Sequence, residues 1–421
     1  MLSTMNPTTA ELLRRLGVAV PRIMLPHPEI DLYRWAVIAC DQHTSEPDYW
    51  EEVAETVDDR PSTLHLIYPE VYLGEEQAEA RIRRIHDRME RYVSDGTVRE
   101  LEPAMILTRR STPHVSERRG LMLALDLEQY DYTPGAQSLT RATEQTIVER
   151  IPPRVRIRKG ASLEVPHVMV LIDDPSDELF GGLLGRDLER LYSTQLMLGG
   201  GEVAGYRVAG DALDHVASSL ERLLEQSNAR NPFLFAVGDG NHSLATAKAV
   251  WDDMKGEAPA DHPARYALVE VVNLYDPGLR FEPIHRLVRT DDPSAWVAGL
   301  ARAMEADAQP CSAADLRREL GRSTTAVGYV TDSSCGLIDP GGSTELPVAA
   351  VQSYIDRQAA AGSDEATHHE VDYIHGWDTS LQLGRTSGSV GVLLPAFSPQ
   401  LLYPTVTRRG VLPRKAFSLG E

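Results

Sequence analysis

The stretch Phe233-Leu-Phe-Ala-Val-Gly-Asp-Gly-Asn-His-Ser-Leu-Ala-Thr-Ala-Lys248 organises our interpretation of the whole chain. Its apolar run 233–237 is long enough for one buried strand. The turn at 238–241 consists of Gly, Asp, Gly and Asn, residues that tolerate a positive φ. From His242 onward, apolar side chains recur at three- and four-residue spacing, as they do on one face of a helix. The stretch therefore predicts a strand, a glycine turn and a helix.

This order of elements favours the binding of an anion, because free backbone N–H groups and the positive end of the helix dipole lie together at the turn. Phosphate suits such a place well. Our candidate phosphate-binding residues are Gly238, Gly240, Asn241 and Ser243. The alternative is an ordinary strand-to-helix turn in which Asn241 or Ser243 caps the helix.

The composition is that of an acidic globular protein. Its 421 residues are enough for two or three domains. A hydrophobic share of 42% and a charged share of 25% are typical of chains that bury a sizeable core. The net charge of −20 argues against nucleic acid as a partner, because a phosphate backbone needs a basic face. A local basic patch around a small anion remains compatible with this charge.

The three cysteines, Cys40, Cys311 and Cys335, lie far apart in the chain. They form neither a metal-ligand spacing nor a disulfide framework, which fits a reducing cytoplasm. The N-terminal residues lack the basic and apolar regions of a signal peptide. No apolar run approaches the length of a membrane span. We therefore expect a cytoplasmic protein that has no membrane partner.

Apolar runs alternate with amphipathic helical segments along the chain, which predicts an α+β (mixed α/β) fold with mixed sheets flanked by helices. We expect a main α/β domain at 1–290, which carries the glycine turn, and a smaller C-terminal α+β part at 291–421. The expected strands of the main domain include 64–68, 105–108, 120–126, 167–172 and 266–272, and the expected helices include 75–93 and 211–226.

The apolar run 35–40 predicts a buried strand. A second cluster of polar residues follows it directly. Polar side chains at a strand end commonly build a site. We therefore assign a substrate pocket to Asp41, Gln42, His43 and Thr44. The alternative is a loop that supplies the N-cap of a helix at 48–57.

A third cluster lies at 140–154, where Thr140 is a good N-cap and Pro152 would end a short helix. Such a helix would place Arg141, Glu144 and Gln145 on one side, where they could act together. The alternative is an intrahelical Arg–Glu pair worth a few tenths of a kcal/mol. The basic segment 154–159 follows, and it would line an anion site or edge a sheet.

These clusters resemble blocks of domain-of-unknown-function family 1015, a widespread bacterial and archaeal family. The similar blocks come in the family's order and cover nearly the whole chain: Ala39–Ser45, Arg141–Thr146, Gly238–Lys248, Phe281–Arg286, Val371–Gly376 and Leu412–Glu421. Many members have Asp-Gly-His-His-Arg where this chain has Asp239-Gly-Asn-His-Ser243, so the motif arginine is absent here. The chain also ends inside its last block, where relatives are expected to continue.

The family's Asp-Gly-His-His-Arg form is similar to the phosphate-binding motif of the ParB/sulfiredoxin superfamily. That superfamily includes nucleotide-using proteins and a kinase of free serine. The resemblance implies a ParB/sulfiredoxin-like core and phosphates held at the 238–243 turn. It is an analogy at the level of fold, and fold does not fix function.

Our leading hypothesis is a nucleotide-dependent phosphotransferase that acts on a small, serine-like metabolite, with Mg²⁺ and ATP or ADP as cofactors. Phosphoryl transfer needs positioning and charge neutralisation more than covalent chemistry. The expected roles are a phosphate contact for His242, a Mg²⁺ ligand for Asp239, a general base for Glu144 and a charge-balancing cation for Arg141. His285 and Arg286 would replace the missing motif arginine.

Two alternatives come from other functional classes. A metal-dependent hydrolase would draw its ligands from Asp41, His43, Asp239, His242 and His285, although none of these lies at close helical ligand spacing. A non-catalytic sensor would use the same pocket for a small molecule. In the leading case the partners are a small-molecule substrate and a nucleotide, and a homodimer is left open.

Overall fold

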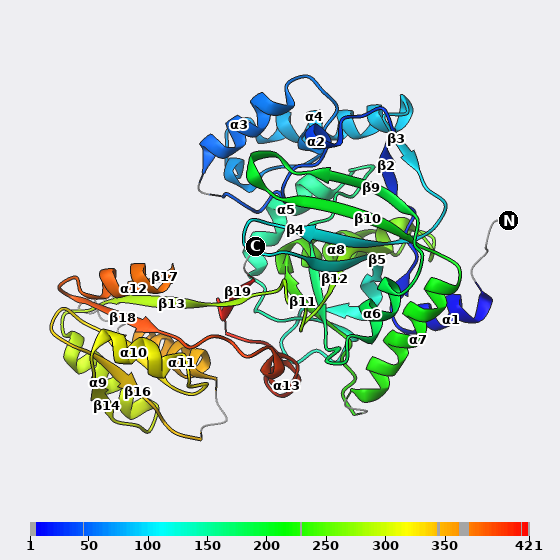
Figure 1. The fold of residues 1–421 in the computed structure, drawn as a ribbon. Coiled ribbons are helices and arrows are strands. Elements are labelled where there is room, and N and C mark those ends of the chain that lie inside the picture. The colour runs from blue at the N-terminus through cyan, green and yellow to red at the C-terminus, as the bar shows by residue number, and fades with distance from the viewer. Residues whose placement is uncertain are drawn as a thin grey trace. The chain divides into compact units, whose positions relative to one another are not determined.

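The computed structural model describes residues 6–44, 46–227, 230–342, 346–361, 370–413 and 415–419. The chain divides into two compact units, which we call unit 1 (Met1–Leu279) and unit 2 (Arg280–Gly420). Unit 1 contains a mixed sheet and unit 2 an antiparallel sheet, each with helices, so the fold is α+β, as the sequence predicts (Figure 1). No helix among the described residues has the length and apolarity needed to cross a membrane.

Unit 1 contains a ten-stranded sheet with the order β6-β7-β11-β8-β12-β5-β4-β10-β9, and β1 pairs with β5 at its side. A separate ribbon joins β2 to β3. The strands are β1 (Val18–Ala19), β2 (Met24–Pro26), β3 (Val98–Glu100), β4 (Met105–Ser111), β5 (Arg118–Asp126), β6 (Tyr130–Asp131), β7 (Thr140–Ala142), β8 (Met169–Ile172), β9 (Arg190–Gln195), β10 (Glu202–Val208), β11 (Phe235–Asp239) and β12 (Tyr266–Asn273).

The helices of unit 1 are α1 (Pro7–Arg15), α2 (Leu32–Trp35), α3 (Pro47–Val57), α4 (Ala78–Ser94), α5 (Ile151–Arg158), α6 (Glu178–Leu184), α7 (Asp211–Gln226) and α8 (Asn241–Met254). Short 3₁₀ turns lie at Thr63–Leu66, Glu70–Tyr72, Leu127–Gln129, Val148–Arg150, Met197–Gly199 and Pro263–Arg265. Side chains of α1, α6, α7 and α8 pack on the sheet and form the main core with it. Figure 1 shows α1, α6 and α7 gathered near one another at this core.

The alternation of burial along β12 shows how the sheet is covered. Ala267, Val269 and Val271 are buried in the main core, whereas Leu268 and Glu270 between them are half-buried. Because successive strand residues point to opposite faces, one face packs on the core and the other is less completely covered. The predicted strands at 105–108, 120–126, 167–172 and 266–272 are confirmed, and so are the helices at 75–93 and 211–226. The predicted strand at 64–68 is wrong, because Thr63–Leu66 forms a 3₁₀ turn.

Unit 2 contains a second sheet with the order β14-β16-β15-β18-β13-β17, and β19 pairs with the start of β13. Its strands are β13 (Phe281–Arg289), β14 (Ala308–Pro310), β15 (Val327–Val330), β16 (Cys335–Ile338), β17 (Val371–His375), β18 (Ser389–Leu393) and β19 (Phe417–Leu419). Its helices are α9 (Pro293–Ala303), α10 (Ala313–Leu320), α11 (Pro347–Ala361), α12 (Trp377–Gly384) and α13 (Leu402–Arg409), with a 3₁₀ turn at Pro399–Leu401.

The predicted strand at 35–40 is wrong. The segment leaves α2 at Trp35 and continues without a strand partner. Val37 and Ile38 pack instead against a small cluster around Trp50, in helix α3. Their apolar character therefore reflects burial under a helix, which an apolar run alone cannot distinguish from burial in a sheet.

The predicted helix at 140–151 is also wrong. Thr140–Ala142 is the strand β7, which pairs in parallel with β11. The helix of this region is α5, which begins at Ile151 and has Pro152 and Pro153 in its first turn. Proline fits there because the first-turn N–H groups have no partner within a helix. The prolines therefore start a helix where the sequence suggested that they end one.

Candidate functional site

The glycine turn has the predicted geometry. Strand β11 ends at Asp239, Gly240 is left-handed with φ 77° and ψ 26°, and α8 begins at Asn241. Gly240, and neither Asn241 nor Ser243, occupies the N-cap position. Its N–H donates to Asp239 Oδ1 at 2.8 Å. The first turn of α8 carries no acidic side chain, and the nearest carboxylate in the chain is that of Asp239, directly before the N-cap.

The parallel pairing of β7 with β11 brings the 143–147 segment to this turn. Thr143 Oγ1 donates to the carbonyl oxygen of Val237 at 2.6 Å, and the Ile147 N–H donates to His242 Nε2 at 3.2 Å. Since Nε2 accepts this bond, the neutral His242 ring carries its proton on Nδ1. Half-buried Glu144 lies on the segment between these two contacts.

Asp41 reaches the same region from the N-terminal part of unit 1. Burial raises the pKa of Asp41, the charges of Asp239 and Glu70 raise it further, and His167 opposes them. Asp41 and Asp239 therefore lie within electrostatic reach of each other. Asp41 Oδ1 is buried and has no hydrogen-bond partner. A buried carboxylate oxygen without a partner commonly marks a place for a water, an ion or a ligand.

The backbone beside Asp41 is held from two sides. The Glu70 N–H donates to the carbonyl oxygen of Cys40 at 2.8 Å, and Arg154 in α5 forms an ion pair with the Glu70 carboxylate. Cys40 Sγ lies 3.9 Å from His167 Nδ1. Burial raises the pKa of the Cys40 thiol far above neutral pH, so the thiol stays protonated and is no nucleophile.

The other residues of the predicted substrate pocket make mainly local contacts. Gln42 and Thr44 are exposed. His43 has a positive φ of 50°, stacks on Tyr49 with ring centroids 3.8 Å apart, and contacts Glu46 at 3.0 Å. Of this cluster, Asp41 is therefore the residue that the structure brings to the turn.

Arg141 serves as a structural clamp. It is 2% exposed, and its guanidinium donates to the carbonyl oxygens of Ser138 and Pro232, each at 2.8 Å. It also donates to Asn231 Oδ1 at 2.5 Å and lies over the Phe233 ring at 4.7 Å. The expected shared helical face with Glu144 does not form, because Arg141 is in a strand.

His285 and Arg286 belong to β13 and are buried inside unit 2. The Leu394 N–H donates to His285 Nδ1 at 3.0 Å, and burial, aided by nearby Arg286 and His375, lowers the pKa of His285 to about 4. Arg286 donates to the carbonyl oxygen of Ile284 and lies over the Tyr373 ring at 4.9 Å. Both side chains therefore have structural partners within unit 2.

The sequence matches the model of the family described as "Protein of unknown function (DUF1015)" over residues 22–357. The chain belongs to this family. Four of the six blocks that we compared with the family lie within the match, and the blocks at 371–376 and 412–421 follow it. Ser45, Arg414, Gly420 and Glu421 of those blocks lie outside the described residues. No curated protein matches this DUF1015 chain in sequence.

Solved structures resemble the DUF1015 chain only distantly. A conserved hypothetical protein from Pyrococcus furiosus has a TM-score of 0.35 at 10% identity, covering 71% of this chain and 90% of its own. A free serine kinase mutant in complex with AMP has a TM-score of 0.38 at 10% identity, covering 71% and 87%. SbnI with a C-terminal truncation, from Staphylococcus aureus, has a TM-score of 0.38 at 9% identity, covering 71% and 82%. We base no functional argument on these similarities.

The DUF1015 structure adds residues that the sequence analysis missed. His167 and Glu70 join the surroundings of Asp41, and Arg154 neutralises Glu70. Arg154 lies in the basic segment 154–159, which we had noted in the sequence as a possible lining of an anion site, so this residue could have been found from the sequence. His167 and Glu70 gave no signal, because neither stands in a recognisable motif.

Glu270 is a further carboxylate that the sequence analysis did not mark. Met169 of β8 pairs with Asp239 on one side and with Glu270 on the other, so Glu270 lies two strands away from Asp239. The Glu270 carboxylate accepts from Thr108 Oγ1 at 2.7 Å and from Arg118 at 3.0 Å. It is therefore already paired, and we assign it to the structure of the sheet.

The ligand set of the predicted hydrolase does not assemble. Throughout the described ranges, no three side chains of His, Cys, Asp or Glu lie close enough together to hold a metal ion. This disfavours an all-protein transition-metal site, which needs at least three ligands. Mg²⁺ is different, since it commonly binds one or two carboxylates together with substrate phosphates.

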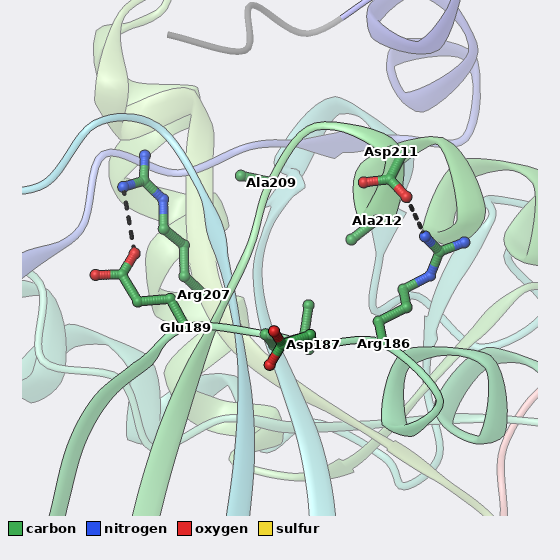
Figure 2. Close-up of a pocket in the computed structure, with 8 residues that line it drawn as sticks. Arg186, Asp187, Glu189, Arg207, Ala209, Asp211 and Ala212 are labelled. Atoms are coloured by element: carbon green, nitrogen blue, oxygen red, sulfur yellow. Dashed lines mark hydrogen bonds and ion pairs between the residues drawn. The ribbon is translucent and has the colours of Figure 1, made fainter. Parts of the chain in front are cut away.

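A cavity of about 390 Å³ lies elsewhere in unit 1, between the segment 186–189 that precedes β9, the end of β10 and the start of α7. Figure 2 shows that its two arginines face carboxylates: Arg207 pairs with Glu189 at 3.9 Å, and Arg186 pairs with Asp211. Asp187 adds another negative charge. With two arginines and three carboxylates the lining has a net negative charge, which disfavours an anion, and the predicted site residues are not among those that line the cavity.

The Gly240→Ala substitution is expected to destabilise the DUF1015 protein by about 1–2 kcal/mol, because a residue with a Cβ is strained in the left-handed region. The added Cβ would also lie 3.1 Å from Val168. Urea unfolding measures the effect. The control is Gly256→Ala, where no atom lies within 4 Å of the new Cβ, so the free energy of unfolding should change by less than about 0.5 kcal/mol. Equal effects in the two variants would contradict the strain at Gly240.

Proposed function

We propose that this protein is a nucleotide-dependent phosphotransferase for a small hydroxyl-bearing metabolite, with the nucleotide phosphates at the 238–243 turn. The observation that carries the proposal is that the Asp41 carboxylate, with its unpartnered Oδ1, lies within electrostatic reach of Asp239, the residue directly before the N-cap of α8. Backbone N–H groups and a helix dipole attract phosphate, whereas the carboxylates suit a divalent cation. The two attractions are complementary in a nucleotide–Mg²⁺ complex.

The charge balance of the site supports a requirement for the cation. Asp41, Asp239 and Glu70 are negative, and Arg154 offsets Glu70. The remaining pair would repel a polyphosphate unless a cation lay between them. Asp239 and the unpartnered Oδ1 of Asp41 would hold Mg²⁺, which would neutralise phosphate charge when bound.

The other roles follow from the contacts of each side chain. His242 accepts from the Ile147 N–H through Nε2, and its ring would contact a phosphate oxygen. Glu144, on the adjacent segment, would accept the proton of the attacking hydroxyl. Gly238, Asn241 and Ser243 would offer backbone N–H groups in place of the missing motif arginine, and the Gly240 N–H would do so only by exchanging its bond to Asp239 Oδ1 for one to the phosphate. The serine-like nature of the acceptor rests on the superfamily resemblance alone.

Nucleotide binding is the first test. With ATP or ADP and Mg²⁺ at about 100 times the dissociation constant, the full-length chain should gain about 2.7 kcal/mol and melt several degrees higher. Omitting Mg²⁺ should remove most of this shift. Asp239→Asn should lose the Mg²⁺-dependent part, whereas Asp332→Asn, at an exposed position in unit 2, should respond like the wild type.

The proposal fails if nucleotides leave the wild-type melting temperature unchanged, or if Asp239→Asn and the wild type respond alike. A second assay follows transfer of labelled γ-phosphate from ATP to a panel of amino acids and amino alcohols. Binding of nucleotide without any transfer across the panel would favour the sensor alternative.

A further inference from the structure

Cys311 and Cys335 are brought together at the edge of the unit 2 sheet, although 23 residues separate them in the chain. Strands β14 and β16 pair in antiparallel fashion with Pro310 opposite Gly336. Cys311 and Cys335 form the next pair in this register. The Cys311 N–H donates to the carbonyl oxygen of Cys335 at 3.0 Å, and Cys335 Sγ contacts the carbonyl oxygen of Cys311 at 3.0 Å.

The two side chains share one face of the sheet. Opposite residues of an antiparallel pair point to the same side, with Cβ atoms about 4.5–5.5 Å apart. Cys311 and Cys335 both pack against the same apolar cluster, which includes Leu316 and Leu320 of α10. Both are half-buried and both are free thiols. The Cα separation of a hydrogen-bonded pair, about 5.5 Å, lies inside the range that a disulfide accepts.

We propose that Cys311 and Cys335 are a modification site, at which a low-molecular-weight disulfide such as oxidised glutathione converts the two thiols into an intrachain disulfide. One cysteine thiolate attacks the reagent and releases one glutathione thiol, and the second cysteine then displaces the other glutathione. One S–S bond forms and one breaks. The two protons of the cysteine thiols end on the two glutathione molecules.

The charges around Cys311 and Cys335 determine the rate of this thiol–disulfide exchange. Burial raises the pKa of the Cys311 thiol, and the neighbouring Cys335, Asp315 and Glu319 raise it further against the opposing charge of Arg318. The Tyr329 hydroxyl, on β15, also lies within electrostatic reach of both thiols. Because the thiolate is the attacking species, the reaction should be slow at neutral pH and should accelerate as the pH rises.

The cross-link would secure a weak part of the fold. Strand β14 has only three residues, ends in a proline and lies at the edge of its sheet. The bond would tie this edge to β16 and close a loop that contains α10 and β15. A closed loop restricts the unfolded chain, so oxidation should stabilise the folded state.

The third cysteine provides an internal control for the experiment. Native full-length protein is incubated with excess oxidised glutathione at pH 8.5, and its free thiols are then counted after denaturation. The count should fall from three to one, with Cys40 as the remaining thiol. The intact mass should fall by about 2 Da, since two hydrogens leave when a disulfide forms. Cys40→Ser should fall from two thiols to none.

The single variants complete the test. Cys311→Ser and Cys335→Ser should form no intrachain bond under the same conditions. Oxidised wild type should melt about 5 °C higher than reduced wild type, and dithiothreitol should reverse the shift. Three remaining thiols, a lasting glutathione adduct on either cysteine, or a bond to Cys40 would each overturn the proposal.

Discussion

The Asp41→Asn protein should melt at a higher temperature than the wild type at pH 7, and the phosphotransfer activity that we propose should fall by about 100-fold or more. The gain in stability follows from burial, which raises the pKa of Asp41 and makes its charged form costly, and from the nearby charges of Asp239 and Glu70. Asn keeps the shape and removes the charge. We expect the free energy of unfolding to increase by on the order of 1 kcal/mol, which is typical when a destabilising charge is removed from a functional site.

The pH dependence of stability independently predicts whether Asp41→Asn is stabilising or destabilising. A carboxyl group whose pKa is raised in the folded state binds more protons there than in the unfolded state, so stability falls as the pH rises. The contribution of Asp41 is therefore present below the unfolded pKa of about 3.9 and is lost as the pH rises through the folded value. The stability advantage of Asp41→Asn should accordingly grow from pH 4 upward and then level off.

Urea unfolding of both proteins between pH 4 and pH 8, without nucleotide or metal, measures this difference. Asp332→Asn serves as the matched control and should show no such trend, because Asp332 is exposed. A lower stability of Asp41→Asn at pH 7 would mean that the Asp41 carboxylate has a stabilising partner. A more stable variant with full activity would remove Asp41 from the proposed site.

The Trp50→Ala protein should lose about 3–5 kcal/mol of stability, the usual cost of removing a large buried aromatic side chain. Trp50 is 1% exposed and forms the centre of a cluster with Val53, Val57 and Met197. Val37 and Ile38, just ahead of Asp41, pack on this cluster. The substitution should therefore also loosen the segment that presents Asp41 and weaken Mg²⁺-dependent nucleotide binding.

The control for this prediction is Tyr33→Ala, which removes another aromatic ring from the same part of unit 1. Tyr33 is 40% exposed, so its loss should cost less than about 1 kcal/mol. Urea unfolding compares the two variants, and titration with Mg²⁺–ADP under stabilising conditions compares their affinities. If the two variants unfold at similar urea concentrations, the cluster does not anchor the segment as we describe.

The strand, turn and helix of 233–248 could be predicted from the sequence because each depends on local properties. The strand needs an apolar run, the turn needs a residue that accepts a positive φ, and the helix needs a regular apolar face. Gly240 takes the required conformation at φ 77°. The family blocks were likewise visible in the sequence, and the family match over residues 22–357 contains four of the six.

The segments 35–40 and 140–151 could not be predicted in the same way, because the local signals fit two outcomes. An apolar run is equally suited to a sheet and to the underside of a helix, and only the position of Trp50 decides between them. A proline is acceptable both after a helix and in its first turn. The pairing of β7 with β11 determines that Pro152 and Pro153 begin α5.

The sequence by itself determined the fold class, the glycine turn and the family of this protein, since these follow from local patterns and ordered blocks. Only the tertiary structure decided which polar residues share a site. It set Asp41 within electrostatic reach of Asp239, gave Arg141 a structural role and placed His285 and Arg286 inside unit 2. It also set Cys311 opposite Cys335. The proximity of residues that are distant in the sequence depends on strand order and register, which are set by packing across the whole chain.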